Sequence, residues 1–521
     1  MLVDGDARVA CVTPAARIAG RSVTTLAGLG PSVQEPLADA FVATGGSQCG
    51  FCTPGILVRL AALFAKHKIA PADLERALAA HLCRCTGWQT ITEAVDLARD
   101  PGRDGAEPRD LMAAARRAEL EGGSPQGVGR WTPLGDAGFA DDTAPRDALV
   151  AVPRPPGSAA EAVDASGIAW VIGETLDDAR RRAGKVQGRR STVADTPPLP
   201  FPDLPTGGVR LATSWVEPGY LEPDASWCQP AGTPATPLAN GGAFGGKTES
   251  PVGPAARILA DQLGRTVRTV FAREDVVRLG PKRPPIAASA VAEAGRVVIR
   301  GVSPGAAPSY ESPYEGLAVA IEWAAAAIPG PPVSTALRAA GRAELTVLVE
   351  GAIDAAGWDR SELVGSDDRS RAVLLDTLAV AESGARAGAR VGVDDTTGIV
   401  SGIEVRVDAG DPLDPVVLRS YAIGAAHMAL GWVLSEGIAV DPETGEVLDL
   451  TIRSFGIVRP KSMPPVLVEI VPGDGPAVPG GSDAVFAAVA AATWNAVARI
   501  EGVRPERFPA AETRAARMLR R

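Results

Sequence analysis

Two short stretches, "SQCGFCTPG" at residues 47–55 and "HLCRCTGWQTI" at residues 81–91, decide the fold of the first part of the chain. They carry a C-x-x-C pair and a C-x-C pair: Cys49, Cys52, Cys83 and Cys85. The apolar periodicity around them predicts a small helical bundle, with helices over 36–44, 54–68, 70–82 and 90–100. Each cysteine pair therefore lies just before a helix, whose N-terminal N–H groups and dipole attract an anionic ligand.

Four thiolates in this arrangement allow three interpretations. A [2Fe-2S] cluster is the first, and Gly50 and Gly87 would let backbone amides approach its sulfurs. Structural zinc is the second, although zinc sites more often pair two C-x-x-C knuckles on turns. A thioredoxin-like redox pair is the third. The tight C-x-C on a helical scaffold favours the iron–sulfur cluster.

The rest of the chain is predicted to be α+β and multidomain. Its 521 residues predict two to four domains, and a net charge of −10 offers no basic stripe for nucleic acid. Neither a membrane-spanning stretch nor a signal pattern is recognisable, so a cytoplasmic protein with no membrane partner is expected. Strands are predicted over 148–152 and 168–172, helices over 175–185, 255–263 and 343–356, and a hairpin from 391 around a "TTG" turn. A long helix is predicted from 483 to 500.

A second motif, "NGGAFGGKTES" at 240–250, matches the phosphate-binding P-loop pattern from Gly241 to Thr248. A P-loop must leave a buried strand and open directly into a helix. Here prolines interrupt the preceding stretch, and Pro251 stands where the helix should already run. The loop is therefore predicted to approach another bulky anion, or to be a plain glycine-rich turn.

These motifs together resemble the xanthine dehydrogenase / aldehyde oxidase family of molybdenum hydroxylases. "QCGFCTPG", "LCRCTG" and the upstream "VDGDARVACVTP…TTLAGL" carry the resemblance at the N-terminus. Farther on, "GGAFGGK", "EPGYLEPDASW", "ALRAAGRAE", "VDDTTGIV…VDAGDPLDP" and "AAATWNAV" resemble segments of its molybdopterin-binding part. The resemblance implies that Cys49, Cys52, Cys83 and Cys85 hold one [2Fe-2S] cluster. It also implies molybdopterin contacts at Gly241, Gly242, Ala243, Phe244, Gly245, Gly246, Arg338 and Gly341.

The resemblance implies a domain order as well. Residues 1–30 would be the remnant of a ferredoxin-like [2Fe-2S] domain, and 31–100 the four-helix [2Fe-2S] domain. The polar, Gly- and Pro-rich residues 101–130 would be a linker. The molybdopterin-binding region would follow, its first part over 131–390 and its last subdomain over 391–521. In the family a second cluster uses four cysteines, of which Cys11 matches the last. The others would precede residue 1, so Cys11 is expected to be a buried, small apolar residue.

The chain departs from the family pattern at its catalytic positions. The family's catalytic base is a glutamate in a G-x-G-E-P motif. The corresponding stretch here, "PAVPGGSDAVF" at 476–486, has Gly481 or Ser482 in its place. Asp483 could act as a displaced base, but an N-cap at the helix start is the favoured interpretation. Tyr421 replaces a cofactor-contacting glutamine, and Gln229 does not match the context of another.

Several other residues are expected to be structural. Cys228 is predicted to be a buried free thiol, and His427 a packed core histidine. "GPKRPP" at 280–285 is predicted to be a solvated loop.

Two functional hypotheses follow. The first is a molybdenum-dependent hydroxylase acting on a purine, aldehyde or N-heterocycle, which passes electrons through the cluster to a separate flavin subunit or another acceptor. The second is a non-catalytic electron-transfer or assembly protein that has lost the molybdenum chemistry. A zinc-stapled protein with a true P-loop is a minor third. The resemblance is also compatible with a homo-oligomer.

Overall fold

The computed structural model describes residues 1–67, 70–100, 109–155, 162–164, 167–184, 195–236, 244–305, 307–473 and 475–520. These residues form a multidomain α+β architecture with four β-sheets, which confirms the predicted fold class. The domain limits drawn from the sequence remain predictions.

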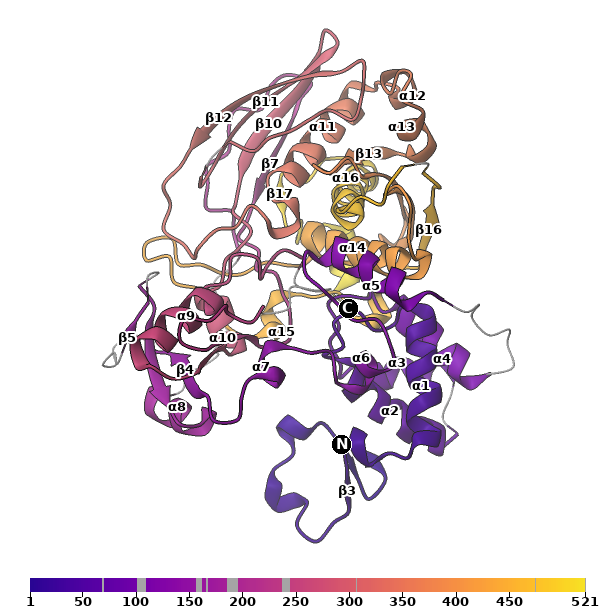
Figure 1. Ribbon diagram of the computed structural model, residues 1–521. Coiled ribbons are helices and arrows are strands. Elements are labelled where there is room, and N and C mark those ends of the chain that lie inside the picture. Colours follow the sequence, from indigo (N-terminus) through magenta and orange to yellow (C-terminus); the bar gives the residue numbers. More distant parts are fainter. Residues whose placement is uncertain are drawn as a thin grey trace.

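The first thirty residues form a small unit at the lower edge of the molecule in Figure 1. Its three two-residue strands, β1 (Leu2–Val3), β2 (Asp6–Ala7) and β3 (Val23–Thr24), pair in the order β2-β1-β3. Short 3-10 turns connect them: η1 (Ala10–Val12), η2 (Ala15–Arg17) and η3 (Leu26–Gly28). Val3 is buried, but Cys11 is exposed. The expectation of a buried Cys11 is therefore wrong, because so small a unit has almost no interior.

The predicted helical bundle is present. It consists of α1 (Pro31–Thr44), α2 (Thr53–Ala65), α3 (Pro71–Leu78) and α4 (Gln89–Arg99). Proline stands in the first turn of α1, α2 and α3, where its missing N–H costs no hydrogen bond. The inward stripes of these helices share one core that includes Phe41, Ile56, Leu60 and Ile91.

The predicted linker contains a helix that is part of the protein core. Residues 101–108 lie outside the described part, but α5 (Leu111–Gly122) is capped by the Asp110 side chain. Ala114 and Ala118 on α5 are buried in the largest core cluster, where the helix packs on α14 (Pro415–Leu434). This segment is therefore fixed to the body of the protein. Two short helices, α6 (Trp131–Leu134) and α7 (Ala140–Thr143), then lead to the next unit.

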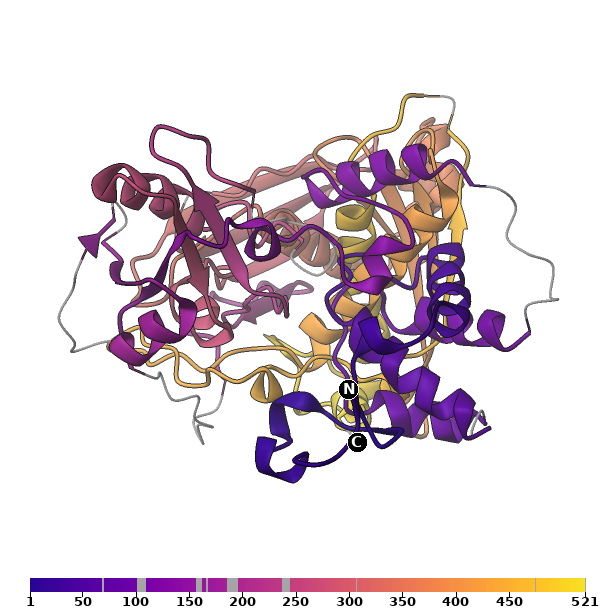
Figure 2. The same ribbon diagram turned by 60° about the horizontal axis from the view of Figure 1, so that its bottom comes forward.

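That unit is a five-stranded mixed sheet in the order β5-β6-β4-β9-β8. The strands are β4 (Leu149–Pro153), β5 (Ala162–Val163), β6 (Ala169–Gly173), β8 (Asp224–Cys228) and β9 (Val267–Phe271). Its helices are α8 (Leu176–Ala183), α9 (Val252–Leu263) and α10 (Arg273–Leu279). Both views place it on the opposite side of the molecule from the helical bundle (Figures 1 and 2).

The largest core lies between two further sheets. One has the order β12-β11-β10-β7-β17: β7 (Val209–Thr213), β10 (Ala287–Glu293), β11 (Arg296–Ser303), β12 (Ala318–Ala325) and β17 (Arg507–Phe508). The other has the order β13-β14-β15-β16: β13 (Thr377–Val380), β14 (Arg386–Val393), β15 (Val400–Asp408) and β16 (Val466–Ile470). The β14–β15 pair is antiparallel, as the predicted hairpin requires.

Helices fill the space between these sheets. α11 (Arg342–Ala356) packs on β7, β10 and β11, whereas α16 (Gly481–Glu501) packs on β13, β14 and β15. α14 and α16 also pack on each other. The remaining helices are short: η5 (Leu337–Ala339), α12 (Arg360–Leu363), α13 (Asp368–Val373), α15 (Ile452–Phe455), η6 (Pro460–Ser462) and α17 (Arg514–Leu519).

Within the described part, α14 is the one helix long and apolar enough to cross a bilayer. Its 18-residue apolar window is 89% buried inside the protein. The apolar character of α14 is therefore explained by its place in the core.

Candidate functional site

The fold brings the two cysteine pairs together at the start of α2 and just before α4. Cys49, Cys83 and Cys85 are exposed by at most 4%, and Cys52 is half-buried. The sulfurs of Cys85 and Cys49 lie 3.4 Å apart, and no disulfide joins any of the described cysteines. The four thiols thus form one buried group with the residue types that an iron–sulfur cluster requires.

The ionisation of these thiols is coupled. Hydrogen bonds from Cys52 and Cys85 hold the pKa of Cys83 well below its usual range, and the Thr86 hydroxyl adds to the effect. The pKa values of Cys52 and Cys85 are raised, mainly because each donates its proton to a neighbouring thiolate. Negative charge is therefore favoured at Cys83, and the neighbouring thiols donate hydrogen bonds that stabilise it.

Glycines let the cysteine loop pack directly on α14. Gly87 has φ +59°, and a Cβ there would lie 2.8 Å from the backbone oxygen of Ile423. On the helix itself, a Cβ at Gly424 would lie 1.8 Å from the Cys85 carbonyl oxygen. Gln48 donates hydrogen bonds to that oxygen (3.1 Å) and to Ser420 on α14 (2.9 Å). The loop is thus locked to the central helix of the molecule.

Arg84, between Cys83 and Cys85, connects this loop to the second motif region. Its guanidinium is 2% exposed and forms a bidentate ion pair with Glu436, which is 1% exposed. Its Nε also donates to the Pro218 carbonyl at 3.1 Å. Nη2 of Arg338 donates to the same carbonyl, also at 3.1 Å. The sequence motifs assigned no role to Arg84. Its position between two cysteines of the motif could have indicated a buried charge that needs a partner.

Of the predicted glycine loop, Gly241, Gly242 and Ala243 lie outside the described residues. Phe244 and Gly245 both have positive φ, and a Cβ on Gly245 would lie 2.3 Å from the Ala336 carbonyl oxygen. The loop is therefore pressed against the second predicted cofactor segment, and Arg338 N–H donates to the Phe244 carbonyl at 3.1 Å. Gly246 is buried beside them.

The loop lysine is not presented to a phosphate. Lys247 is 2% exposed and its Nζ lies 3.0 Å from Oε1 of Glu222, over the ring of Tyr220. Glu222, in the "YLEP" segment at 220–223, thus neutralises the charge of Lys247, the lysine of the P-loop pattern. After Thr248 the chain stays in turns until α9 begins at Val252. Both observations agree with rejecting a P-loop.

The "GPKRPP" segment was predicted to be a solvated loop, and this is wrong. Lys282 and Arg283 are exposed by 0% and 1%. Arg283 donates to the carbonyls of Leu337 (3.0 Å) and Arg338 (3.1 Å) and pairs with Glu344 at 2.6 Å. Glu344 in turn accepts the Gly341 N–H at 2.6 Å. The short basic segment therefore holds the predicted cofactor loop in place, which only tertiary contacts reveal.

Arg338 itself is an unusual buried cation. It is 3% exposed, lies in the left-handed region (φ +50°) and stacks over Phe244 and Phe486. Among the described residues, its Nη1 has no hydrogen-bond partner. Burial lowers its pKa, and the nearby charge of Arg84 lowers it further. A buried guanidinium with a free donor is stabilised by an anion.

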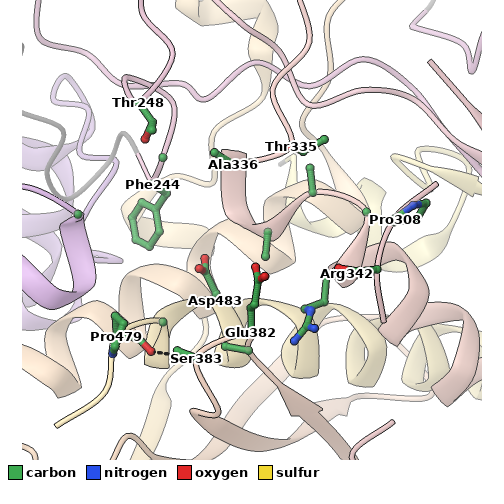
Figure 3. Close-up of a pocket in the computed structure, with 18 of the residues that line it drawn as sticks. Phe244, Thr248, Pro308, Thr335, Ala336, Arg342, Glu382, Ser383, Pro479 and Asp483 are labelled. Atoms are coloured by element: carbon green, nitrogen blue, oxygen red, sulfur yellow. Dashed lines mark hydrogen bonds between the residues drawn. The ribbon is translucent and has the colours of Figure 1, made fainter. Parts of the chain in front are cut away.

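Three segments that are distant in sequence meet at one cavity of about 730 Å³. The glycine loop contributes Phe244, Gly245 and Thr248, and the second segment contributes Ala336, Ala339, Ala340, Gly341 and Arg342. The start of α16 contributes Pro479, Gly480 and Asp483. In Figure 3, Phe244, Thr248 and Ala336 lie on one side of this space, and Asp483, Glu382 and Arg342 lie on the other.

Asp483 is not the predicted N-cap. The N-cap of α16 is Gly480, without a side-chain cap, and the Asp483 carboxylate points into the cavity (Figure 3). Burial raises its pKa to about 7, and the negative charge of Glu121 contributes, whereas Arg338 and Arg283 oppose the shift. Glu121, on α5, accepts the Ser482 N–H at 2.9 Å. The carboxylate of Glu121, which comes from the predicted linker, therefore accepts a backbone N–H at the start of α16. This is the kind of contact that was expected of Asp483.

Three other residues singled out in the sequence, His427, Cys228 and Tyr421, are buried in the core. His427 is a buried core histidine whose Nε2 lies 2.9 Å from the Val458 carbonyl, and Cys228 is a buried free thiol, both as predicted. Tyr421 is buried, donates to Gln126 at 2.9 Å and packs near Phe244, with ring centroids 6.2 Å apart. Gln229 is exposed beyond the end of β8 and does not line the cavity.

Comparison with known proteins agrees with the N-terminal site. Residues 25–96 match a protein family described as a [2Fe-2S] binding domain, and this range includes all four cysteines. The nicotine 6-hydroxylase small subunit of Paenarthrobacter nicotinovorans is 43% identical over 96 residues, which are 18% of this chain and 58% of that protein. The xanthine dehydrogenase iron-sulfur-binding subunit of Escherichia coli O157:H7 is 38% identical over 99 residues, which are 18% of this chain and 62% of that protein. The chain therefore spans about three fifths of the length of these relatives.

The comparison of structures extends over the whole chain. The aldehyde oxidoreductase of Desulfovibrio desulfuricans superposes with a TM-score of 0.69 at 14% identity, covering 99% of this chain and 94% of that one. The aldehyde oxidoreductase of Desulfovibrio gigas gives 0.68 at 14% identity, with 100% and 94% coverage. At this identity the likeness concerns the fold. Residues 25–96 are therefore similar to the [2Fe-2S] part of xanthine dehydrogenase-type proteins, and the whole chain shares the fold of the two aldehyde oxidoreductases.

Proposed function

We propose that this chain is a molybdenum-dependent oxidoreductase that oxidises a small purine, aldehyde or N-heterocycle and passes the electrons to a [2Fe-2S] cluster. One observation carries the proposal. Two segments that resemble molybdopterin contacts and the start of α16 line a single cavity, and one backbone carbonyl, that of Pro218, links Arg338 of the cavity region to the cysteine loop.

Cys49, Cys52, Cys83 and Cys85 would hold the cluster. They fit it because they are largely buried and lie close together, and because neighbouring thiols lower the pKa of Cys83. Neighbouring residues support the geometry, since the Cys85 carbonyl is held by Gln48 and rests against Gly424.

The second site fits an anionic cofactor on one wall of the cavity. Gly245, Ala336 and Gly341 present backbone and small side chains there, so a large group can approach closely. Arg338 lies nearby as a buried cation, and its Nη1 has no hydrogen-bond partner among the described residues. Bound at this wall, molybdopterin would supply the two-electron oxidation of a substrate carbon. Arg283 and Glu344 would keep the loop in place.

The opposite wall supplies a base. Asp483 faces the cavity, and a carboxyl group whose pKa is about 7 can accept a proton near neutral pH. We therefore assign to Asp483 the role of general base, which the family pattern gives to a glutamate missing from this sequence. Glu121 holds the Ser482 N–H, which fixes the first turn of α16 and with it the position of Asp483.

The test begins with the metal content of the purified protein. About two irons and one molybdenum per chain, with visible bands bleached by dithionite, are expected, followed by turnover of at least one substrate of the named classes. Iron without molybdenum would instead favour the non-catalytic electron-transfer protein. Zinc without iron would overturn both hypotheses.

The role of Asp483 as general base is tested by two matched variants of the protein that contains both iron and molybdenum. Asp483→Asn should lower kcat by about 10²-fold or more, because general-base catalysis contributes about 10²–10⁴-fold. Glu382→Gln removes another carboxylate that lines the cavity, one that is exposed, and should change kcat by much less. Equal losses in the two variants would contradict a specific role of Asp483.

A further inference from the structure

The group of four cysteines has one side that approaches the surface. Cys49, Cys83 and Cys85 are exposed by at most 4%, whereas Cys52 is half-buried. Its neighbour Phe51 is 43% exposed, although it is a large apolar residue. Electron tunnelling weakens steeply with distance, so an electron leaves a buried cluster most readily through the ligand nearest the surface. Of the four cysteines that would hold the cluster, Cys52 is the one nearest the surface.

Phe51 is the centre of a continuous surface built from two loops. The ring of Phe51 packs edge-on against Phe139, with centroids 6.2 Å apart. The glycine before it, Gly50, approaches Ala137 so closely that a Cβ would lie 3.2 Å from that side chain. A Cβ on Gly135 would lie 3.5 Å from the Pro54 ring. We name this the Phe51 surface; its members are all exposed or half-buried: Phe51, Cys52, Pro54, Leu134, Gly135, Asp136 and Ala137.

The edge of the Phe51 surface is acidic. Asp136 and Asp142 are exposed, and Asp141 lies beside them at the start of α7. The three carboxylates interact. Burial is the largest cause that raises the pKa of Asp142, and the negative charges of Asp141 and Asp136 raise it further. Two cations lie nearby: Arg268 is 3.5 Å from Asp141, and the buried Lys247, paired with Glu222, lies over the Phe139 ring. Negative charge is therefore in excess around the exposed apolar centre.

We propose that the Phe51 surface is the docking site for a basic, one-electron-accepting carrier protein. An apolar centre with a charged rim is the pattern of short-lived protein contacts, in which the rim charges speed the encounter. The electron passes from the reduced cluster to the oxidised carrier, so the cluster returns to its oxidised state and the carrier is reduced by one electron. This transfer needs only the [2Fe-2S] cluster, and it occurs whether or not the cavity binds molybdenum.

The test uses cytochrome c as a basic one-electron acceptor and ferricyanide as a small anionic one. The full-length protein, with its iron content measured, is reduced with stoichiometric dithionite and mixed with each acceptor in a stopped-flow instrument. The rate with cytochrome c should fall steeply as ionic strength rises, because the Debye length shrinks from about 30 Å at about 0.01 M to about 8 Å at about 0.15 M.

Charge-reversal variants locate the contact. Asp136→Lys with Asp142→Lys should lower the rate with cytochrome c by about tenfold at low salt, since electrostatic steering is worth about 10–10³-fold. The rate with ferricyanide should rise or stay unchanged. The control, Asp368→Lys with Glu443→Lys, changes the net charge equally at exposed positions outside this surface, and should alter the rate by much less.

A third variant tests the apolar centre without changing the charge. Phe51→Ser should slow electron transfer to cytochrome c while leaving the ferricyanide rate and the iron content unchanged. Equal losses in the surface and control variants would show a general charge effect and overturn the proposal. The same conclusion follows if neither surface variant affects cytochrome c, or if no reducible cluster is present. Absence of hydroxylase turnover alone would leave these results intact, so the two proposals fail separately.

Discussion

Gly424 on α14 offers the sharpest test of how the cysteine loop is held. An alanine there would place its Cβ 1.8 Å from the Cys85 carbonyl oxygen, whereas ordinary contact begins at 3.4 Å. The loop would have to retreat by about 1.6 Å, the difference between these two distances. The obstacle is backbone, so no side-chain rotation relieves it.

The expected cost can be built from its parts. Overpacking of a core costs about 1–3 kcal/mol, and the hydrogen bond from Gln48 to Cys85 that the shift would break contributes about 1 kcal/mol. Alanine recovers about 1 kcal/mol through its higher helix propensity. Gly424→Ala should therefore lower the free energy of unfolding by about 1–3 kcal/mol. It should also reduce iron occupancy, because metal–ligand distances tolerate only about 0.2 Å.

The matched control is Gly253→Ala on α9. There the nearest atoms to an added Cβ are 3.8 Å and 3.9 Å away, so the methyl group fits. This variant should keep its iron and be as stable as the parent or slightly more so. Iron per chain, visible absorbance and thermal unfolding distinguish the two. A Gly424→Ala protein with full iron and an unchanged melting temperature would refute the packing argument.

Three further predictions concern buried charges. Arg84→Met leaves Glu436 buried without its partner and should cost about 3–5 kcal/mol in urea unfolding, whereas Arg84→Met with Glu436→Leu should recover most of it. Lys247→Met leaves Glu222 buried and unpaired and should likewise cost about 3–5 kcal/mol, and adding Glu222→Gln should restore stability; an additive double variant would contradict the pairing. Asp483 has a raised pKa, so the folded state binds an extra proton between about pH 4 and pH 7, and this stabilisation is lost as pH rises through about 7. Asp483→Asn should therefore raise the melting temperature more at about pH 8 than at about pH 5, and an equal shift at both would count against the assigned pKa.

The sequence alone determined the parts of this protein that depend on neighbours along the chain. The helices of the bundle, the β14–β15 hairpin and the long terminal helix follow from local periodicity, turn residues and prolines, which act within a few residues. The cysteine spacing was equally local, and one helical hairpin between the two pairs brought the four thiols together. Proline placement also sufficed to reject a P-loop at Gly241–Thr248.

Only the tertiary structure decided which charged residues are buried and what they face. Lys282 and Arg283 looked like a solvated loop because the partner of Arg283, Glu344, is 61 residues away. Arg84 meets Glu436 across 352 residues, and Glu121 reaches the start of α16 across 361. A capping aspartate and a cavity-facing aspartate have the same local sequence, so Asp483 could not be assigned from it. Burial of a charge depends on a partner brought close by the whole fold, and local sequence carries no record of that partner.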